Sequence, residues 1–108
     1  MTAISTHVLD TALGRPAAGI NIWIERREGE TWNKIASSET DADGRCRELA
    51  NAVEGVYRIT FFSGEYLSRL GRSSIFQEIS VLFSCAGETH FHLPLLLSDN
   101  SYTTYRGS

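Results

Sequence analysis

The stretch INIWIERR, residues 20–27, decides the fold class of this 108-residue chain. Its isoleucines occupy every second position, at 20, 22 and 24, and more polar side chains stand between them. Successive side chains of a β-strand point to opposite faces of the sheet, so this spacing predicts a strand with one buried face. The following Glu28-Gly29-Glu30 is typical of a hairpin turn into a second strand at Trp32 to Ser37.

The same two-residue period recurs along most of the chain. It predicts strands at residues 4–9, 20–25, 32–37, 45–49, 57–62, 79–83, 89–97 and 102–105. One segment departs from it: Glu65 to Leu70 predicts a short helix, with Gly71 as its stop signal. We therefore expect an all-β fold, a two-sheet antiparallel β-sandwich of about eight strands with one short helix. It should form a single domain over residues 1–108, with the tryptophans and other aromatic side chains in its core.

The composition narrows the classes of partner. The formal net charge is -3, so no overall basic field attracts nucleic acid. The longest apolar stretch, Leu93 to Leu97, contains Pro94 and is too short to span a membrane. The N-terminus lacks the basic and apolar regions of a signal peptide. We expect a cytoplasmic protein in which the two cysteines, Cys46 and Cys85, are reduced.

Three histidines are the first candidates for chemistry. His90 and His92 are two residues apart on a predicted strand, so both side chains leave the same face. That face can simply be wet, or the pair can join His7 in a zinc site. A third interpretation is a metal-free site in which a histidine moves protons near neutral pH. The residues alone leave these three interpretations open.

The stretch Asp41-Ala42-Asp43-Gly44 has a local resemblance to a calcium-binding loop. It lacks the required oxygen ligands, because Arg45 and Ala52 stand where acidic or polar side chains are needed. The pattern instead predicts a tight turn with Gly44 at positive φ. No Gly-x-Ser-x-Gly motif is present, so the sequence gives no sign of a serine nucleophile on a strand-to-helix turn.

Three stretches taken together resemble the transthyretin-like 5-hydroxyisourate hydrolases, nearly from end to end. They are STHVLDTALGRPAAGI near the start, TDADGR in the middle and HFHLPLLLSDNSYTTYRGS at the end. The final Tyr-Arg-Gly-Ser is the most specific part, since the hormone-carrying transthyretins share the fold but lack this ending. The chain departs from the family pattern at Phe91, Leu93 and Asp99, all outside the matched functional positions.

The resemblance implies a transthyretin-like fold and an enzyme of urate degradation. Such enzymes add water to the N1–C6 amide of 5-hydroxyisourate and give the ureidoimidazoline OHCU, without metal or cofactor. They are homotetramers, dimers of dimers, with active sites in the channel between dimers. The alternative function is that of a transthyretin-like carrier, which binds a small aromatic ligand in the same channel.

Carried over residue by residue, the resemblance assigns two groups of site residues. The catalytic group is His7, Arg45, His92 and Ser108, and the substrate-binding group is Tyr105, Arg106 and Gly107. The resemblance leaves open which histidine is the general base, and His90 is expected to have a supporting or structural role. The terminal tetrapeptide should form part of the active-site wall, with a glycine where a Cβ would block close approach.

Overall fold

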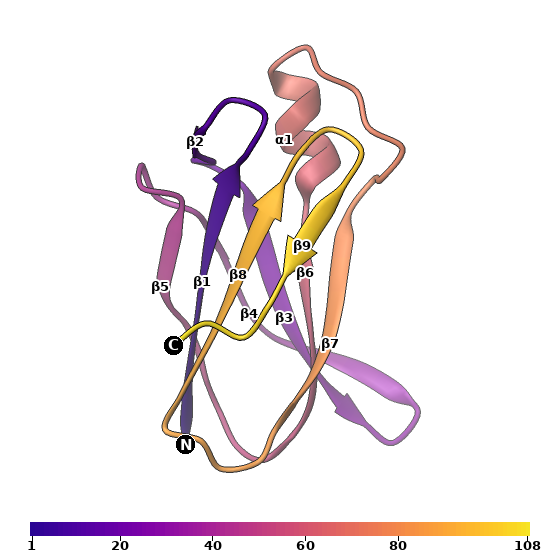
Figure 1. Cartoon of the computed structure of the whole chain (residues 1–108). Helices are drawn as coiled ribbons and strands as arrows, with labels where there is room; N and C mark the ends of the chain where they lie inside the picture. The colour runs from indigo at the N-terminus through magenta and orange to yellow at the C-terminus, as the bar shows by residue number, and fades with distance from the viewer.

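The computed structural model describes residues 1–108 and contains two β-sheets that pack face to face, with one short helix at one end (Figure 1). The five-stranded sheet consists of β1 (Thr2–Asp10), β2 (Arg15–Pro16), β5 (Arg45–Ala52), β8 (His90–Leu97) and β9 (Tyr102–Thr104). The four-stranded sheet consists of β4 (Thr31–Glu39), β3 (Asn21–Glu28), β6 (Gly55–Phe61) and β7 (Ile79–Cys85), in that order. The predicted two-sheet sandwich is therefore confirmed.

The alternating isoleucines of β3 lie in the core, as their spacing predicts. Ile20, Ile22 and Ile24 are all buried, and Val8 and Leu95 from the five-stranded sheet belong to the same cluster. Burying one such side chain contributes about 1.5–3 kcal/mol relative to leaving it exposed. The inward-facing side chains of the strands thus hold the two sheets together, and the outward-facing side chains remain free for other chemistry.

The tryptophans do not lie in this core, so that expectation was wrong. Trp23 and Trp32 are half-buried, with the ammonium of Lys34 at 4.7 Å from the Trp23 ring centroid and the guanidinium of Arg58 at 4.3 Å from that of Trp32. The isoleucines take the inward positions of β3, which leaves Trp23 on the outward ones. The aromatic side chains of the core are Tyr57, Phe61, Tyr66 and Phe91.

One strand pair departs from the expected antiparallel pattern. β1 and β8 run parallel over eight residue pairs, from Ala3 beside His90 to Asp10 beside Leu97, whereas every other pair of strands is antiparallel. This pairing sets Ser5 directly beside His92. The two-residue strand β2, which pairs with the end of β1, was not predicted from the sequence.

The helix α1 spans Ser63–Arg69, close to the predicted segment. Tyr66 and Leu67 are buried against the sandwich, but Leu70 at the helix end is 46% exposed. Gly71 has a φ of +72°, a conformation that glycine adopts without steric cost, and the helix stops there as predicted.

An ion network around the buried Asp10 ties the end of β1 to the turn between β8 and β9. Arg72 donates to Asp10 Oδ2 at 2.6 Å and to Asp99 Oδ1 at 2.5 Å, and the Tyr66 hydroxyl donates to Asp10 Oδ2 at 2.9 Å. Complete burial of Asp10 pushes its pKa upward, but the hydrogen bonds from Arg72 and Tyr66 outweigh burial and leave the pKa lowered. The network therefore anchors the β8–β9 hairpin from which the C-terminal segment leaves.

Candidate active site

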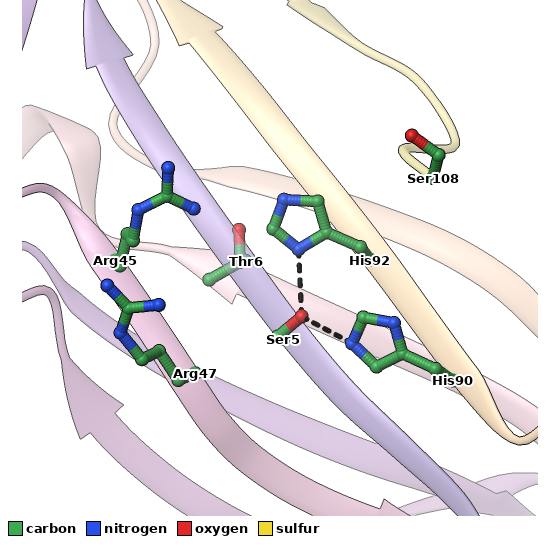
Figure 2. A pocket seen from close by; sticks show the side chains of 7 residues that line it. All are labelled: Ser5, Thr6, Arg45, Arg47, His90, His92 and Ser108. Carbon is green, nitrogen blue, oxygen red and sulfur yellow. Dashed lines mark hydrogen bonds between the residues drawn. The ribbon is translucent and has the colours of Figure 1, made fainter.

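A polar pocket lies on the outer face of the five-stranded sheet, across β5, β1 and β8 (Figure 2). Its volume is about 260 Å³, and none of its lining residues is hydrophobic. The lining residues are Ser5, Thr6, Arg45, Arg47, His90, His92 and Ser108. The structure thus brings together three of the four residues that were expected to be catalytic: Arg45, His92 and Ser108.

The pocket's two histidines are joined through Ser5, which was not among the predicted site residues. In the parallel β1–β8 ladder, Ser5 is paired with His92, and Ala3 with His90, so all these side chains leave the same face. Ser5 Oγ lies 2.8 Å from His92 Nδ1 and 2.9 Å from His90 Nε2 (Figure 2). One hydroxyl therefore holds both imidazoles in place.

The turn before β5 fixes the position of Arg45, the first residue of that strand. The Asp41 carboxylate accepts hydrogen bonds from the backbone N–H groups of Arg45 and Asp43, both at 2.9 Å, and the bond from Arg45 is the main cause of the lowered pKa of Asp41. Gly44 has a φ of +75°, and a Cβ there would come within 2.4 Å of the Val8 carbonyl oxygen. The predicted tight turn with glycine at positive φ is confirmed.

A β-bulge in β5 supplies a second arginine to the pocket. The register between β1 and β5 shifts from Thr6 beside Cys46 to Ile4 beside Ala50, so β5 contains extra residues opposite Ser5. Arg45 and Arg47 both line the pocket, and neither guanidinium forms an ion pair within the chain. The pocket therefore has a concentrated positive charge that suits an acidic ligand.

His92 is electrostatically prepared to stay neutral. Its partial burial lowers its pKa below the ordinary value of 6.5, and electrostatic interactions with His90, Arg45 and His7 lower it further. A hydrogen bond with Ser5 acts in the opposite direction but does not cancel these effects. Near pH 7 the imidazole is uncharged and can accept a proton.

His7 lies at the margin of this pocket and is not among its lining residues. It is the cross-strand neighbour of Arg45, and its Nε2 lies 3.0 Å from the carbonyl oxygen of Asp43. Because a carbonyl only accepts, the Nε2 of His7 carries a hydrogen and donates it. The remaining nitrogen, Nδ1, is the only one of this ring that is free to act as a base.

The C-terminal segment turns back across β8 (Figure 1). The Gly107 N–H donates to the His92 carbonyl at 2.8 Å. A Cβ on Gly107 would lie 2.6 Å from His92 Cδ2, far closer than carbon atoms pack, and in a tight contact of 3.2 Å with Pro94 Cγ. The absence of a side chain at this position therefore lets the backbone reach the imidazole and carry Ser108 into the pocket.

The other two residues of the tetrapeptide do not line the pocket within one chain. The guanidinium of Arg106 lies 5.0 Å from the ring centroid of Phe91 and 3.8 Å from Glu88 Oε2. Tyr105 is exposed on the surface of the chain. Arg106 thus contacts Phe91 and Glu88 and is absent from the pocket lining.

The three histidines do not converge as a metal-binding cluster, since no group of three or more His, Cys, Asp or Glu side chains is placed to share an ion. His90 and His92 are held by Ser5, whereas His7 is turned toward the Asp43 carbonyl. The structure contains no helix long and apolar enough to cross a membrane.

Comparisons with known proteins agree with the fold. The model of the HIUase/Transthyretin family matches residues 4–107. A 5-hydroxyisourate hydrolase of Mus musculus is 41% identical, over 97% of this chain and 94% of its own length. The structure of a Klebsiella pneumoniae 5-hydroxyisourate hydrolase is 38% identical with a TM-score of 0.90, and each chain is covered completely.

The carrier branch of the family is equally close in backbone. A crystal structure of sea bream transthyretin in complex with thyroxine has a TM-score of 0.93 but is 30% identical, over 97% of this chain and 94% of that one. Backbone similarity therefore does not separate the two branches. On the match over residues 4–107 and the relatives that span its whole length, this chain belongs to the HIUase/Transthyretin family.

Proposed function

We propose that residues 1–108 form a single hydrolase domain that converts 5-hydroxyisourate to OHCU in urate degradation. The observation that carries the proposal is the placement of unpaired Arg45 beside neutral His92 and Ser108 in a pocket without hydrophobic lining. The named activity of the Mus musculus and Klebsiella pneumoniae relatives supports the choice of substrate. The substrate is a flat acidic ring, and the two guanidiniums of the pocket complement its charge.

In the proposed mechanism, His92 accepts a proton from water as the water oxygen bonds to C6 of the substrate. Negative charge then develops on the C6 oxygen, and the Arg45 guanidinium stabilises it. The C6–N1 bond breaks, and the proton held by His92 passes to N1. This general-base step accounts for roughly a hundredfold to ten-thousandfold of the rate. All steps use water and protein side chains, and we propose that neither a metal nor a cofactor takes part.

The hydrogen bonds of the two candidate bases favour His92 over His7. His7 donates from Nε2 to the Asp43 carbonyl and lies outside the pocket lining, whereas His92 lies within it beside Ser108. We assign His7 to the orientation of substrate or water at the pocket margin. The Ser108 hydroxyl, which lines the same pocket as His92, is proposed to hold the attacking water.

The alternative function, a carrier of a small aromatic ligand, is disfavoured by the chemistry of the pocket. Sea bream transthyretin, whose structure contains thyroxine, has the same fold. Pockets that bind such ligands are lined mainly by hydrophobic and aromatic side chains, but this pocket has none. The arginines and histidines would have to be desolvated for an apolar ligand without any hydrogen bond in return.

We further propose that the enzyme is a homotetramer, a dimer of dimers, with its sites in the channel between dimers. The pocket volume of about 260 Å³ is below the ~300 Å³ that small-molecule sites usually reach, which supports completion by a second subunit. The proposed substrate-binding roles of Tyr105 and Arg106 would also arise at that boundary. The free, buried Cys46 and Cys85 support the proposed cytoplasmic location.

The test of function is to add the protein to freshly oxidised urate and to follow the ultraviolet decay of 5-hydroxyisourate. We expect decay faster than the spontaneous reaction, unchanged by a chelator, with OHCU as the product. Light scattering on the same sample should give four times the chain mass of 12.0 kDa. Decay at the spontaneous rate, together with tight binding of an aromatic ligand, would leave the carrier function in its place.

A further inference from the structure

The hydroxyl between the two histidines has too few protons to satisfy both as a donor. Ser5 Oγ lies 2.8 Å from His92 Nδ1 and 2.9 Å from His90 Nε2, and the Ser5 side chain is buried. A serine hydroxyl has one hydrogen and two lone pairs. At least one of the two rings must therefore donate its own N–H to Ser5 Oγ. The positions of the ring protons on His90 and His92 are thus coupled through this one atom.

The surroundings of His92 decide which ring donates. Figure 2 shows the second nitrogen of the His92 ring, Nε2, turned away from Ser5 and on the side of the pocket where Arg45 lies. A guanidinium has only donors, so a lone pair is favoured on the imidazole nitrogen that faces it. For a neutral ring this places the single proton on Nδ1, which then donates to Ser5 Oγ.

The proton of the Ser5 hydroxyl then has one partner left. His90 Nε2 is within hydrogen-bond distance of Ser5 Oγ and can accept, provided that the proton of the neutral His90 ring is on Nδ1. The three groups form a directed chain in which His92 donates to Ser5 and Ser5 donates to His90. This gives His90 a defined role as the acceptor that fixes the orientation of the hydroxyl.

We propose that Ser5 is a positioning residue that holds His92 in its Nδ1–H tautomer, so that Nε2 presents a lone pair to the attacking water. The tautomer follows from the contacts of this chain, while its use in accepting a proton from water rests on the proposed hydrolase function. The nitrogen that a histidine leaves unprotonated is set by the hydrogen bond of the other nitrogen. Without Ser5, the Nδ1–H of His92 loses its hydrogen-bond acceptor, and only the charge of Arg45 still favours the base-competent form of the ring.

The direct test is nuclear magnetic resonance of the whole protein with ¹⁵N-labelled histidine, at a pH where His92 is neutral. The ring ¹⁵N shifts report which nitrogen carries the proton, and His7→Gln and His90→Gln spectra assign the signals. We expect wild-type His92 protonated on Nδ1. In Ser5→Ala we expect a shift toward protonation on Nε2, and in Ser5→Thr, which keeps a hydroxyl, the wild-type tautomer.

The kinetic arm separates positioning from substrate binding. Ser5→Ala should lower kcat about tenfold to a hundredfold with little change in KM, which is less than the whole contribution of a general base. Ser5→Thr should recover most of the loss, and Ser38→Ala, at an exposed serine of β4, should have no effect. A loss that Ser5→Thr does not restore would overturn the role of the hydroxyl.

The two proposals fail in different ways. Wild-type His92 protonated on Nε2, or a tautomer unchanged in Ser5→Ala, would overturn the assignment to Ser5 even in a fully active hydrolase. A wild-type protein that does not accelerate 5-hydroxyisourate decay would overturn the proposed function. In that case an Nδ1–H tautomer lost in Ser5→Ala would still support the contact chain.

Discussion

Two regions of this molecule concentrate arginine, and they treat its charge in opposite ways. At one end of the sandwich, Arg72 is held between the carboxylates of Asp10 and Asp99. On the outer face of the five-stranded sheet, Arg45 and Arg47 line a pocket without any ion pair in the chain. The charge of Arg72 is neutralised within the fold, whereas the charges of Arg45 and Arg47 remain available to a ligand.

Mutation can separate these two roles of a charged side chain. A paired and buried charge cannot be removed without leaving its partner uncompensated, so mutation is felt in folding. An unpaired charge in a preformed pocket contributes little to folding, so mutation is felt in catalysis.

Removal of Arg72 should have the largest effect on stability. In Arg72→Met, the carboxylate of Asp10 stays fully buried and loses its cationic partner, which should cost about 3–5 kcal/mol of unfolding free energy. The measurement is urea denaturation of the purified protein. Arg27→Met, at an exposed arginine of β3, is the matched control and should stay within about 0.5 kcal/mol of wild type. Equal stability of the two variants would contradict the structural role of Arg72.

Replacement of Arg45 should have the converse effect. Arg45→Lys keeps the charge but loses the planar fork, and kcat/KM for 5-hydroxyisourate should fall a hundredfold or more, about 2.7 kcal/mol or greater. The unfolding free energy should stay within about 0.5 kcal/mol of wild type, because no ion pair of the chain is broken. Near-normal turnover in a folded Arg45→Lys protein would show that this arginine only follows the turn.

Gly107 gives a smaller effect that tests how tightly the C-terminal segment fits the site. A Cβ in Gly107→Ala would overlap His92 Cδ2, so the ring or the segment must move, and we expect kcat to fall about tenfold. Gly29→Ala is the control: a Cβ there meets no atom within 4 Å, but φ is +65°. It should therefore cost some stability and leave activity unchanged. A Gly107→Ala enzyme as active as wild type would mean that Ser108 is not placed by this contact.

The smallest effects concern pH, because the two regions lose their contributions to the free energy of unfolding at different pH values. The folded protein holds the pKa of His92 below 6.5, so its contribution to stability is lost as pH falls below 6.5, where the unfolded chain takes up the proton. The contribution of Asp10, whose pKa is held below 3.8, is lost only as pH falls below that value.

A nuclear magnetic resonance titration of His92 sharpens the point. Because Arg45 repels the imidazolium, Arg45→Met should raise the pKa of His92 toward 6.5, though not fully, since burial is the larger cause. Arg72→Met should leave the pKa of His92 where it is. A His92 pKa that does not move in Arg45→Met would remove that arginine from the electrostatics of the site.

Local sequence pattern was sufficient for most of the architecture, because alternation, turn glycines and helix stops act over a few residues. The buried isoleucines at 20, 22 and 24, the Gly44 turn and the end of α1 just before Gly71 were all predicted in this way. Strand pairing is not local, and nothing in the residues 2–10 or 90–97 states that the two strands run parallel. The placement of Trp23 likewise depends on which face of β3 meets the other sheet, which alternation alone does not decide.

The site shows the same division. Arg45, His92 and Ser108 were proposed through family resemblance, and the fold brings them into one pocket. Ser5 was missed because a serine before a histidine has no signature, and its role depends on the parallel ladder. Arg47 was missed because the bulge in β5 decides on which face of the sheet its side chain lies. Two neighbours on a sheet face are a property of register, which spacing along one strand cannot reveal.

The parallel pairing of β1 with β8 also has a consequence for the order of events during synthesis. The contacts of this ladder join residues about 87 positions apart, from Ala3–His90 to Asp10–Leu97. Contacts so distant in sequence form late, because the entropy of closing the intervening loop must be overcome first. On the ribosome, the strands of the four-stranded sheet can emerge and pair before β8, the parallel partner of β1, has been made. The pocket should therefore be assembled only after nearly the whole chain has been made, so a nascent chain has no hydrolytic site.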